Sequence, residues 1–136
     1  MRRTLLLAFG LAACTSTDGV FEPKSVYPPD PYVKGYADPE DCLGGEDLMA
    51  ISLPLPEYPA RPYRTGRQGW VILRLDIAAD GTIAEAEAER AVPKGLFEKA
   101  AEEGAMRWRF EPPASGGLRD CRILVSFRLG EVRLGG

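Results

Sequence analysis

The chain has 136 residues, of which 45% are hydrophobic and 27% charged, and its formal net charge is −3 at pH 7. This length fits one small domain with an extension, and the acidic balance argues against nucleic acid as a partner. The chain has no histidine, which removes the usual general base near neutral pH and the commonest metal ligand, so the composition argues against an enzyme.

The first residues have the layout of a secretory signal. Two arginines precede an apolar run, Leu5 to Ala13, which is too short to cross a bilayer. The stretch from Leu11 to Cys14 resembles the lipobox of bacterial lipoproteins. This resemblance implies that residues 1–13 are removed and that Cys14 receives lipid. The alternative is ordinary cleavage, which leaves Cys14 as a free thiol.

The cysteine count suggests one disulfide. The chain has three cysteines, so if Cys14 takes lipid, Cys42 and Cys121 remain as a pair in an oxidising compartment. A bridge between them would stabilise the fold by at most about 4–5 kcal/mol in the chain-entropy model. Zinc is a poor alternative, because two cysteines without histidine supply too few ligands.

Residues 14–53 are predicted to form a tether behind the lipidated cysteine. Prolines are scattered among Gly, Asp, Lys and Tyr with no sustained period, a composition that favours extended, partly ordered chain. The Pro-Pro-Asp-Pro run at residues 28–31 fits a recognition motif or a spacer, and a spacer is the simpler interpretation. Residues 46–55 can add a short helix or an edge strand.

Two strands joined by a tight turn are predicted next. Apolar residues alternate with more polar ones from Val71 to Ile77, which is the period of a half-buried strand. The pair Asp80-Gly81 is a strong hairpin signal because glycine accepts a positive φ. A second strand should run over about residues 82–90. Its apolar phase slips between Ile83 and Ala86, which suggests a bulge.

A helix and a third strand complete the pattern. Phe97, Ala101, Ala105 and Trp108 form one stripe at helical spacings, and Trp108 and Phe110 are interpreted as core residues. The Pro-Pro pair at 112–113 ends this element. Alternation over residues 121–129 then predicts a strand. The expected fold is α+β, a two-layer ββαβ unit in which one helix packs on one face of a three-stranded antiparallel sheet.

This order of signals resembles the C-terminal domain of the TonB family of bacterial energy-coupling proteins. The matching parts are Tyr58-Pro59-Ala60-Arg61, Gly69, Asp80-Gly81, Phe97 and the run from Trp108 to Pro112. The resemblance implies a domain over residues 54–130, followed by a tail at 131–136. It also implies a domain that binds envelope proteins, above all the TonB-box peptides of outer-membrane receptors, and not an enzyme.

No catalytic residue, metal site or cofactor is predicted. None of the serines lies in a nucleophile-elbow context, and no glycine-rich loop has the spacing that holds a phosphate. Glu85, Glu87 and Glu89 alternate along the second predicted strand and are typical of its solvated face.

An open sheet edge is the predicted binding site, because exposed edge amides pair readily with an extended peptide. The resemblance places the third strand at that edge, so a peptide would pair along residues 122–128. Its outward neighbours would be Arg122, Leu124, Ser126 and Arg128. Arg61 and Tyr63 occupy an entry region that the family also places against receptor peptides. The alternative is that Tyr63 packs on the sheet end and the strand arginines only keep the edge soluble.

The chain departs from the family in its first half. TonB proteins carry an uncleaved transmembrane helix and a long spacer rich in proline and lysine, and neither is evident in this sequence. We therefore expect a TonB-like binding module on a lipid anchor. Thr15 after Cys14 suggests sorting to the outer membrane, with the domain in the periplasm.

The expected partners are TonB-dependent receptors, in a module that takes part in TonB-dependent transport. The alternative is a structural or cell-wall-binding outer-membrane lipoprotein with no role in energy coupling. An open edge also permits a strand-exchanged homodimer.

Overall fold

The computed structural model describes residues 25–31, 48–128 and 130–135. The predicted leader at 1–13, Cys14 and Cys42 lie outside the described residues. In the part of the chain that is described, no helix is long and apolar enough to span a bilayer.

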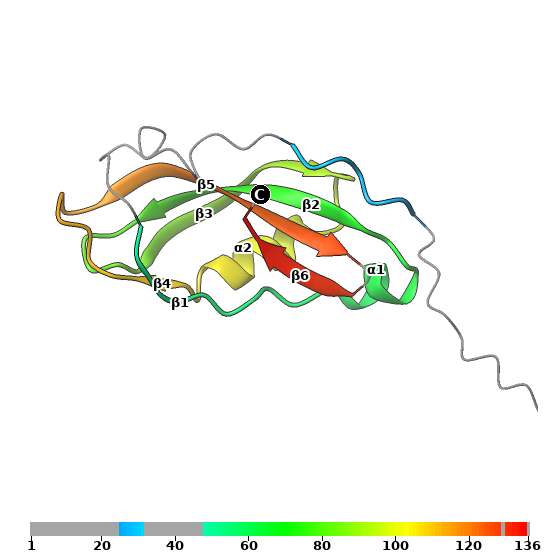
Figure 1. Cartoon of the computed structure of the whole chain (residues 1–136), viewed down its shortest axis with the longest axis horizontal. Coiled ribbons are helices and arrows are strands. Elements are labelled where there is room, and N and C mark those ends of the chain that lie inside the picture. The colour runs from blue at the N-terminus through cyan, green and yellow to red at the C-terminus, as the bar shows by residue number, and fades with distance from the viewer. Residues whose placement is uncertain (1–24, 32–47, 129, 136) are drawn as a thin grey trace, which may run out of the picture.

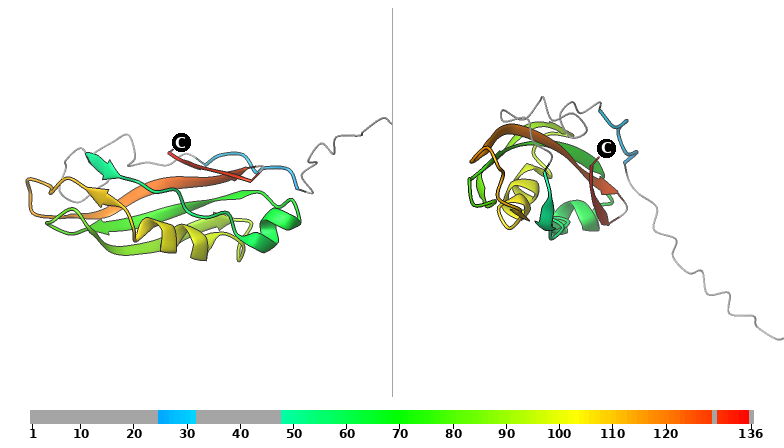
Figure 2. Two further views of the ribbon diagram at one scale, coloured as in Figure 1. Left: turned by 90° about the horizontal axis from the view of Figure 1, so that it is seen from below. Right: turned by 60° about the vertical axis from the view of Figure 1, so that its left-hand side comes forward.

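Six strands and two helices follow one another in the described residues. In chain order they are β1 (Ala50–Ser52), α1 (Ala60–Arg64), β2 (Gly69–Ile77), β3 (Ile83–Val92), α2 (Glu98–Ala105), β4 (Arg109–Phe110), β5 (Leu118–Arg128) and β6 (Glu131–Leu134). The main sheet has the strand order β3-β2-β5-β6, with antiparallel neighbours throughout. It curves over α2, which covers one of its faces (Figures 1 and 2).

The predicted hairpin is confirmed as β2 and β3. Gly81 in the turn has a φ of 85°, and the Asp80 carboxylate accepts hydrogen bonds from the main-chain N–H of Thr82 at 3.0 Å and from its hydroxyl at 2.7 Å. The predicted bulge is confirmed as well. The register of the two strands shifts where Ile83 and Glu85 face consecutive residues of β2.

The helix is shorter than the apolar stripe suggested, because α2 ends at Ala105 and Trp108 lies beyond it. The stripe still packs as predicted, since Phe97, Ala101, Ala105 and Trp108 are fully buried in the core. The Trp108 indole N–H donates to the Pro54 carbonyl at 2.9 Å. This bond ties the segment after β1 to the core.

The prediction of three strands is wrong, because the sheet has four. The predicted tail forms β6, which pairs with β5 over four residue pairs, from Val125–Leu134 to Arg128–Glu131. Gly130, with a φ of 82°, lies in the tight connection between the two strands. Leu129, the last residue of the predicted third strand, lies outside the described residues. The α+β class and the antiparallel pairing are confirmed.

Residues 48–58 cross the molecule on the same side of the sheet as α2 (Figure 2). β1 within this segment pairs with β4, which confirms the edge-strand interpretation of residues 46–55. Pro56 lies directly against Gly104 of α2. The segment therefore forms part of the layer that covers the core.

Residues 25–31 lie on the opposite face of the sheet, beside β2 and β5 (blue in Figure 1). Tyr27 packs against a second buried cluster formed by Trp70, Ile72 and Leu124. This stretch of the predicted tether includes the whole Pro-Pro-Asp-Pro run at residues 28–31. It is packed on the domain and is therefore more than a plain spacer.

Candidate functional site

The edge of the sheet at β5 is covered by β6. The Gly135 N–H donates to the Leu124 carbonyl at 2.8 Å. Hydrogen-bonded pairs alternate along an antiparallel ladder, so the main-chain groups of Leu124, Ser126 and Arg128 all point towards β6. The prediction that the third strand is an open edge is therefore wrong, because the chain's own last strand pairs with β5 there.

β6 is held only lightly. It has four residues, and none of its side chains is fully buried: Val132 and Leu134 are half-buried, while Glu131 and Arg133 are exposed. Among the described residues, its other side has no strand partner. On that side the main-chain groups of Val132 and Leu134 point outward, by the same alternation. β6 contributes no fully buried residue to the core.

A groove runs along the outer side of β6. Its volume is about 430 Å³, and it lies between Leu55, Pro56 and Tyr58 on one wall and residues 130–133 on the other. Leu55 is 53% exposed there. The groove offers an apolar wall and open space next to the strand that covers β5.

Arg61 and Tyr63 lie on α1, near one end of this groove. A Cβ atom on Gly130 would approach the Tyr63 ring to 2.6 Å, so Tyr63 packs on the β5–β6 connection as the alternative prediction held. The ring remains 52% exposed, and it meets the Tyr58 ring edge-on with centroids 5.8 Å apart. Burial raises the pKa of Tyr58. Arg61 is exposed.

The four predicted outward neighbours on β5 are not an exposed row, and this part of the prediction is wrong. Leu124 is fully buried and Ser126 is 5% exposed, because residues 25–31 cover them. Arg128 pairs with Asp30 at 3.0 Å. Their side chains are therefore already in contact with the chain itself, and only their main-chain groups face the edge.

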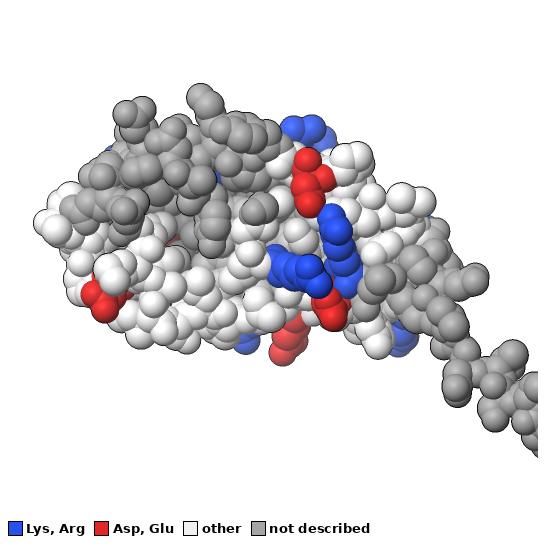
Figure 3. Space-filling view, in the orientation of Figure 1, with Lys and Arg blue, Asp and Glu red and all other residues white. Residues whose placement is uncertain are grey.

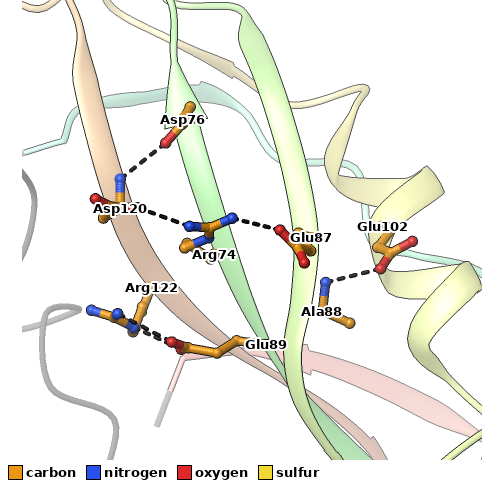
Figure 4. Close-up of polar contacts among 8 residues, drawn as sticks. All are labelled: Arg74, Asp76, Glu87, Ala88, Glu89, Glu102, Asp120 and Arg122. Carbon is orange, nitrogen blue, oxygen red and sulfur yellow. Dashed lines mark hydrogen bonds and ion pairs between the residues drawn. The ribbon is translucent and has the colours of Figure 1, made fainter.

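Arg122 belongs to a set of ion pairs on the sheet surface (Figure 4). Its guanidinium donates to both carboxylate oxygens of Glu89, at 2.7 and 3.1 Å. Next to it, Arg74 bridges Glu87 and Asp120 at 2.5 and 3.3 Å. The hydrogen bond from Arg122 lowers the pKa of Glu89. These pairs join β3, β2 and β5 across the sheet.

The far edge of the sheet, at β3, is partly blocked. The Ala88 N–H donates to the Glu102 carboxylate of α2 at 2.9 Å (Figure 4). A side chain that occupies an edge amide prevents another strand from using it. The β5–β6 side is therefore the better candidate for strand pairing.

Charges of both signs mix on the part of the surface that the described residues form. On the face seen in Figure 3, basic and acidic side chains lie side by side. Ion pairs join Arg128 to Asp30 and Arg133 to Glu131. Within residues 25–31, 48–128 and 130–135, no group of three or more His, Cys, Asp or Glu is arranged to hold a metal ion.

The structure is a small α+β domain, in which a curved antiparallel sheet packs on one short helix and a short strand closes one sheet edge. The family described as the Gram-negative bacterial TonB protein C-terminal has a model that matches residues 54–129. This match covers more than half of the chain, so the chain belongs to that family.

Curated relatives and a solved structure agree with this assignment. Protein TonB of Pseudomonas aeruginosa is 30% identical over 98 residues, which cover 70% of this chain and 29% of that protein. Protein TonB of Escherichia coli is 35% identical over 69 residues, which cover 49% of this chain and 29% of that protein. The solution NMR structure of the Pseudomonas aeruginosa TonB CTD aligns with a TM-score of 0.55 and 26% identity, covering 67% of this chain and 95% of that one.

The resemblance and the fold class expected from the sequence are thus confirmed. The match is to one domain only, since the chain spans about a third of the length of these two curated relatives.

Proposed function

We propose that this protein is a non-enzymatic module of the cell envelope that binds an extended peptide of an outer-membrane receptor by strand pairing with β5. The observation that carries this proposal is the weak hold of β6. It covers the pairing edge with four residue pairs and buries none of its side chains completely. A peptide that takes the place of β6 gains this edge and has to replace only the half-buried contacts of Val132 and Leu134 with the core.

β5 is long enough to form more backbone hydrogen bonds with a bound peptide than it forms with β6. β5 has 11 residues, whereas β6 pairs with only the last four of them. Backbone hydrogen bonds give affinity in this mode of recognition, so a peptide that pairs with more of β5 than β6 does can displace it. In this proposal Arg122, Leu124, Ser126 and Arg128 contribute their main-chain groups, and not their side chains, to the peptide.

The groove beside β6 supports the exchange. It gives the displaced or incoming strand open space against the apolar wall that includes Leu55. Tyr63 and Arg61 lie beside the β5–β6 connection, so we propose that they contact the end of the bound peptide that reaches this connection.

The anchor and the location belong to the same proposal, and they are supported by the sequence alone. We propose that Cys14 carries lipid, that the protein lies in the outer membrane with its domain in the periplasm, and that Cys42 and Cys121 are bridged. Cys121 is buried near the start of β5, so a bridge there would tie the tether to the sheet.

Two variants test the strand exchange with peptides from receptor N-termini. Deleting residues 131–136 removes β6, and we expect the affinity for the peptide to rise by about thirtyfold or more, since roughly four net hydrogen bonds, each of at least about 0.5 kcal/mol, no longer compete. The pair Ser126→Cys with Arg133→Cys joins partners of the ladder, whose Cα atoms lie about 5.5 Å apart in such pairs, within disulfide range. The oxidised form should lose peptide binding, and reduction should restore it.

The reduced double variant and the wild-type protein with reductant are the matched controls. If the locked form binds the peptide as well as its reduced form does, β6 is not displaced. If deletion of residues 131–136 weakens binding, the peptide instead adds to the outer side of β6. Binding to purified cell wall with none to any receptor peptide would replace this proposal with the structural lipoprotein.

A further inference from the structure

The second face of the sheet holds residues 25–31, which we name the clasp. The clasp has neither helix nor strand, and it contacts the domain at three places spread over its length. Each place pairs a polar group of the clasp with a side chain of the sheet or of the turn before β2. The three contacts together determine what kind of segment this face accepts.

The first contact holds Ser25. The main-chain N–H of Gln68 donates to the Ser25 hydroxyl at 2.9 Å, and the Gln68 side-chain amide donates to the Ser25 carbonyl at 2.7 Å. The Ser25 hydroxyl lies 3.4 Å from the Gly66 carbonyl. Gln68 is only 6% exposed, so these bonds are made by a polar side chain that is nearly buried.

The second contact uses an indole. The Trp70 Nε1–H donates to the Pro29 carbonyl at 3.0 Å, and Trp70 is 3% exposed. A buried indole needs an acceptor for its N–H, and the Pro29 carbonyl in this proline-containing segment supplies it. The Arg90 guanidinium lies 5.4 Å from the same ring.

The third contact is charged. Arg128 donates to the Asp30 carboxylate at 3.0 Å, and its guanidinium lies 3.6 Å from the centroid of the Tyr27 ring. The Tyr27 hydroxyl also donates to Asp30, at 2.5 Å. An arginine that stacks on an aromatic ring while it pairs with an acid recognises both groups at once.

We propose that the outer face of β2 and β5 is a binding site for an extended, proline-containing segment that carries an aromatic residue and an acid. The clasp is its resident ligand, and its docking sets the free length of the tether. Prolines keep such a segment extended before it binds, which lowers the entropy lost on docking. The indole donor and the aromatic contact are features that proline-rich segments meet at other binding sites.

The effect on length rests on the proposed lipidation of Cys14. With the clasp docked, only residues 15–24 separate the lipidated residue from the domain, and they reach at most about 40 Å. With the clasp released, residues 15–41 are free as far as the proposed Cys42–Cys121 bridge, and their reach is about 100 Å at full extension. Docking of the clasp therefore limits the distance between the binding edge and the membrane, and its release increases that distance.

Hydrogen exchange of the two tryptophan indoles tests the site in the full chain. Trp70 donates to the clasp, whereas Trp108 donates to Pro54, so the second indole is an internal control. In the double variant Tyr27→Ala with Asp30→Ala, we expect the Trp70 indole N–H to exchange about tenfold faster, because a charged hydrogen bond and a stacking contact are lost. Exchange at Trp108 should not change.

Val26→Ala is the matched control inside the clasp, since Val26 is 91% exposed and should leave both rates unchanged. An unchanged Trp70 rate in the double variant would overturn the binding site. Small-angle scattering of the same proteins tests the length: the double variant should have the greater maximum dimension, and equal dimensions would overturn the control of the tether. Neither measurement involves Cys14, so both stay separate from the test of lipidation.

Discussion

Gly104 gives the sharpest test of the packing, because the sequence and the structure predict opposite outcomes for Gly104→Ala. Alanine is favoured over glycine in a helix by about 1 kcal/mol, so helix propensity alone predicts a more stable protein. In the structure a Cβ at position 104 would lie 2.7 Å from the Cβ and Cγ atoms of Pro56. We expect the variant to be less stable.

The magnitude follows from the distance. Carbon atoms pack at about 3.5–4.0 Å, so the segment around Pro56 must move by about 1 Å to admit the methyl group. Overpacking of this kind costs about 1–3 kcal/mol, and the helix gain offsets about 1 kcal/mol of it. The shift also disturbs the bond from Trp108 to the Pro54 carbonyl, which adds about 1 kcal/mol. The net loss is about 1–3 kcal/mol.

Thermal or urea unfolding of the wild-type protein and the variant measures this loss, and a domain of this size should lose about 4–8 °C in Tm per kcal/mol. A double-mutant cycle with Pro56→Gly identifies the cause. That change removes the two nearest atoms, so Gly104→Ala should cost less in its background. The Cα atom of residue 56, 2.8 Å away, remains in this background, so part of the cost should persist. If Gly104→Ala raises the stability, the contact with Pro56 does not explain the glycine.

Three further outcomes are expected. Arg122 holds the pKa of Glu89 below its ordinary value, so the pair stabilises the fold above the ordinary glutamate pKa. This contribution is lost as the pH falls through the lowered pKa of Glu89. In Glu89→Gln, the free energy of unfolding measured between about pH 6 and 3 should therefore depend less on pH. In unreduced mature protein, titration should find no reactive thiol if Cys42 and Cys121 are bridged, and two would remove the bridge. Cys14→Ala should abolish membrane association while the circular dichroism of the domain is retained, whereas unchanged fractionation would reject the anchor.

The central elements could be predicted because local signals and long-range packing agree there. The alternation from Val71 to Ile77 and the turn at Asp80-Gly81 fix a hairpin almost without regard to the rest of the chain. The stripe from Phe97 to Trp108 has one face that only the sheet can cover, and all four of its apolar residues are buried. The apolar pattern of the sequence and the packing of the core therefore require the same arrangement of hairpin and helix.

The candidate site could not be predicted in full, because two of its parts, β6 and the clasp, are short segments with polar residues that pair with the sheet. β6 has a period of two over only four residues, which is too short to stand out, although the signal at Val132 and Leu134 is present once Gly130 is recognised as a turn residue. The clasp has no period at all. No sequence pattern indicates that Tyr27 and Asp30 both contact Arg128, and only the structure shows these two contacts.

The two features meet on the same half of β5, and together they explain why the open edge predicted for this strand is covered in the structure. In a strand, main-chain groups point along the sheet while side chains point to its faces. On Leu124, Ser126 and Arg128, β6 occupies the main-chain groups and the clasp covers the side chains. A peptide that replaces β6 leaves the clasp contacts in place, because it approaches along the sheet and not over its face. Binding at the edge and docking of the tether can therefore coexist on one strand.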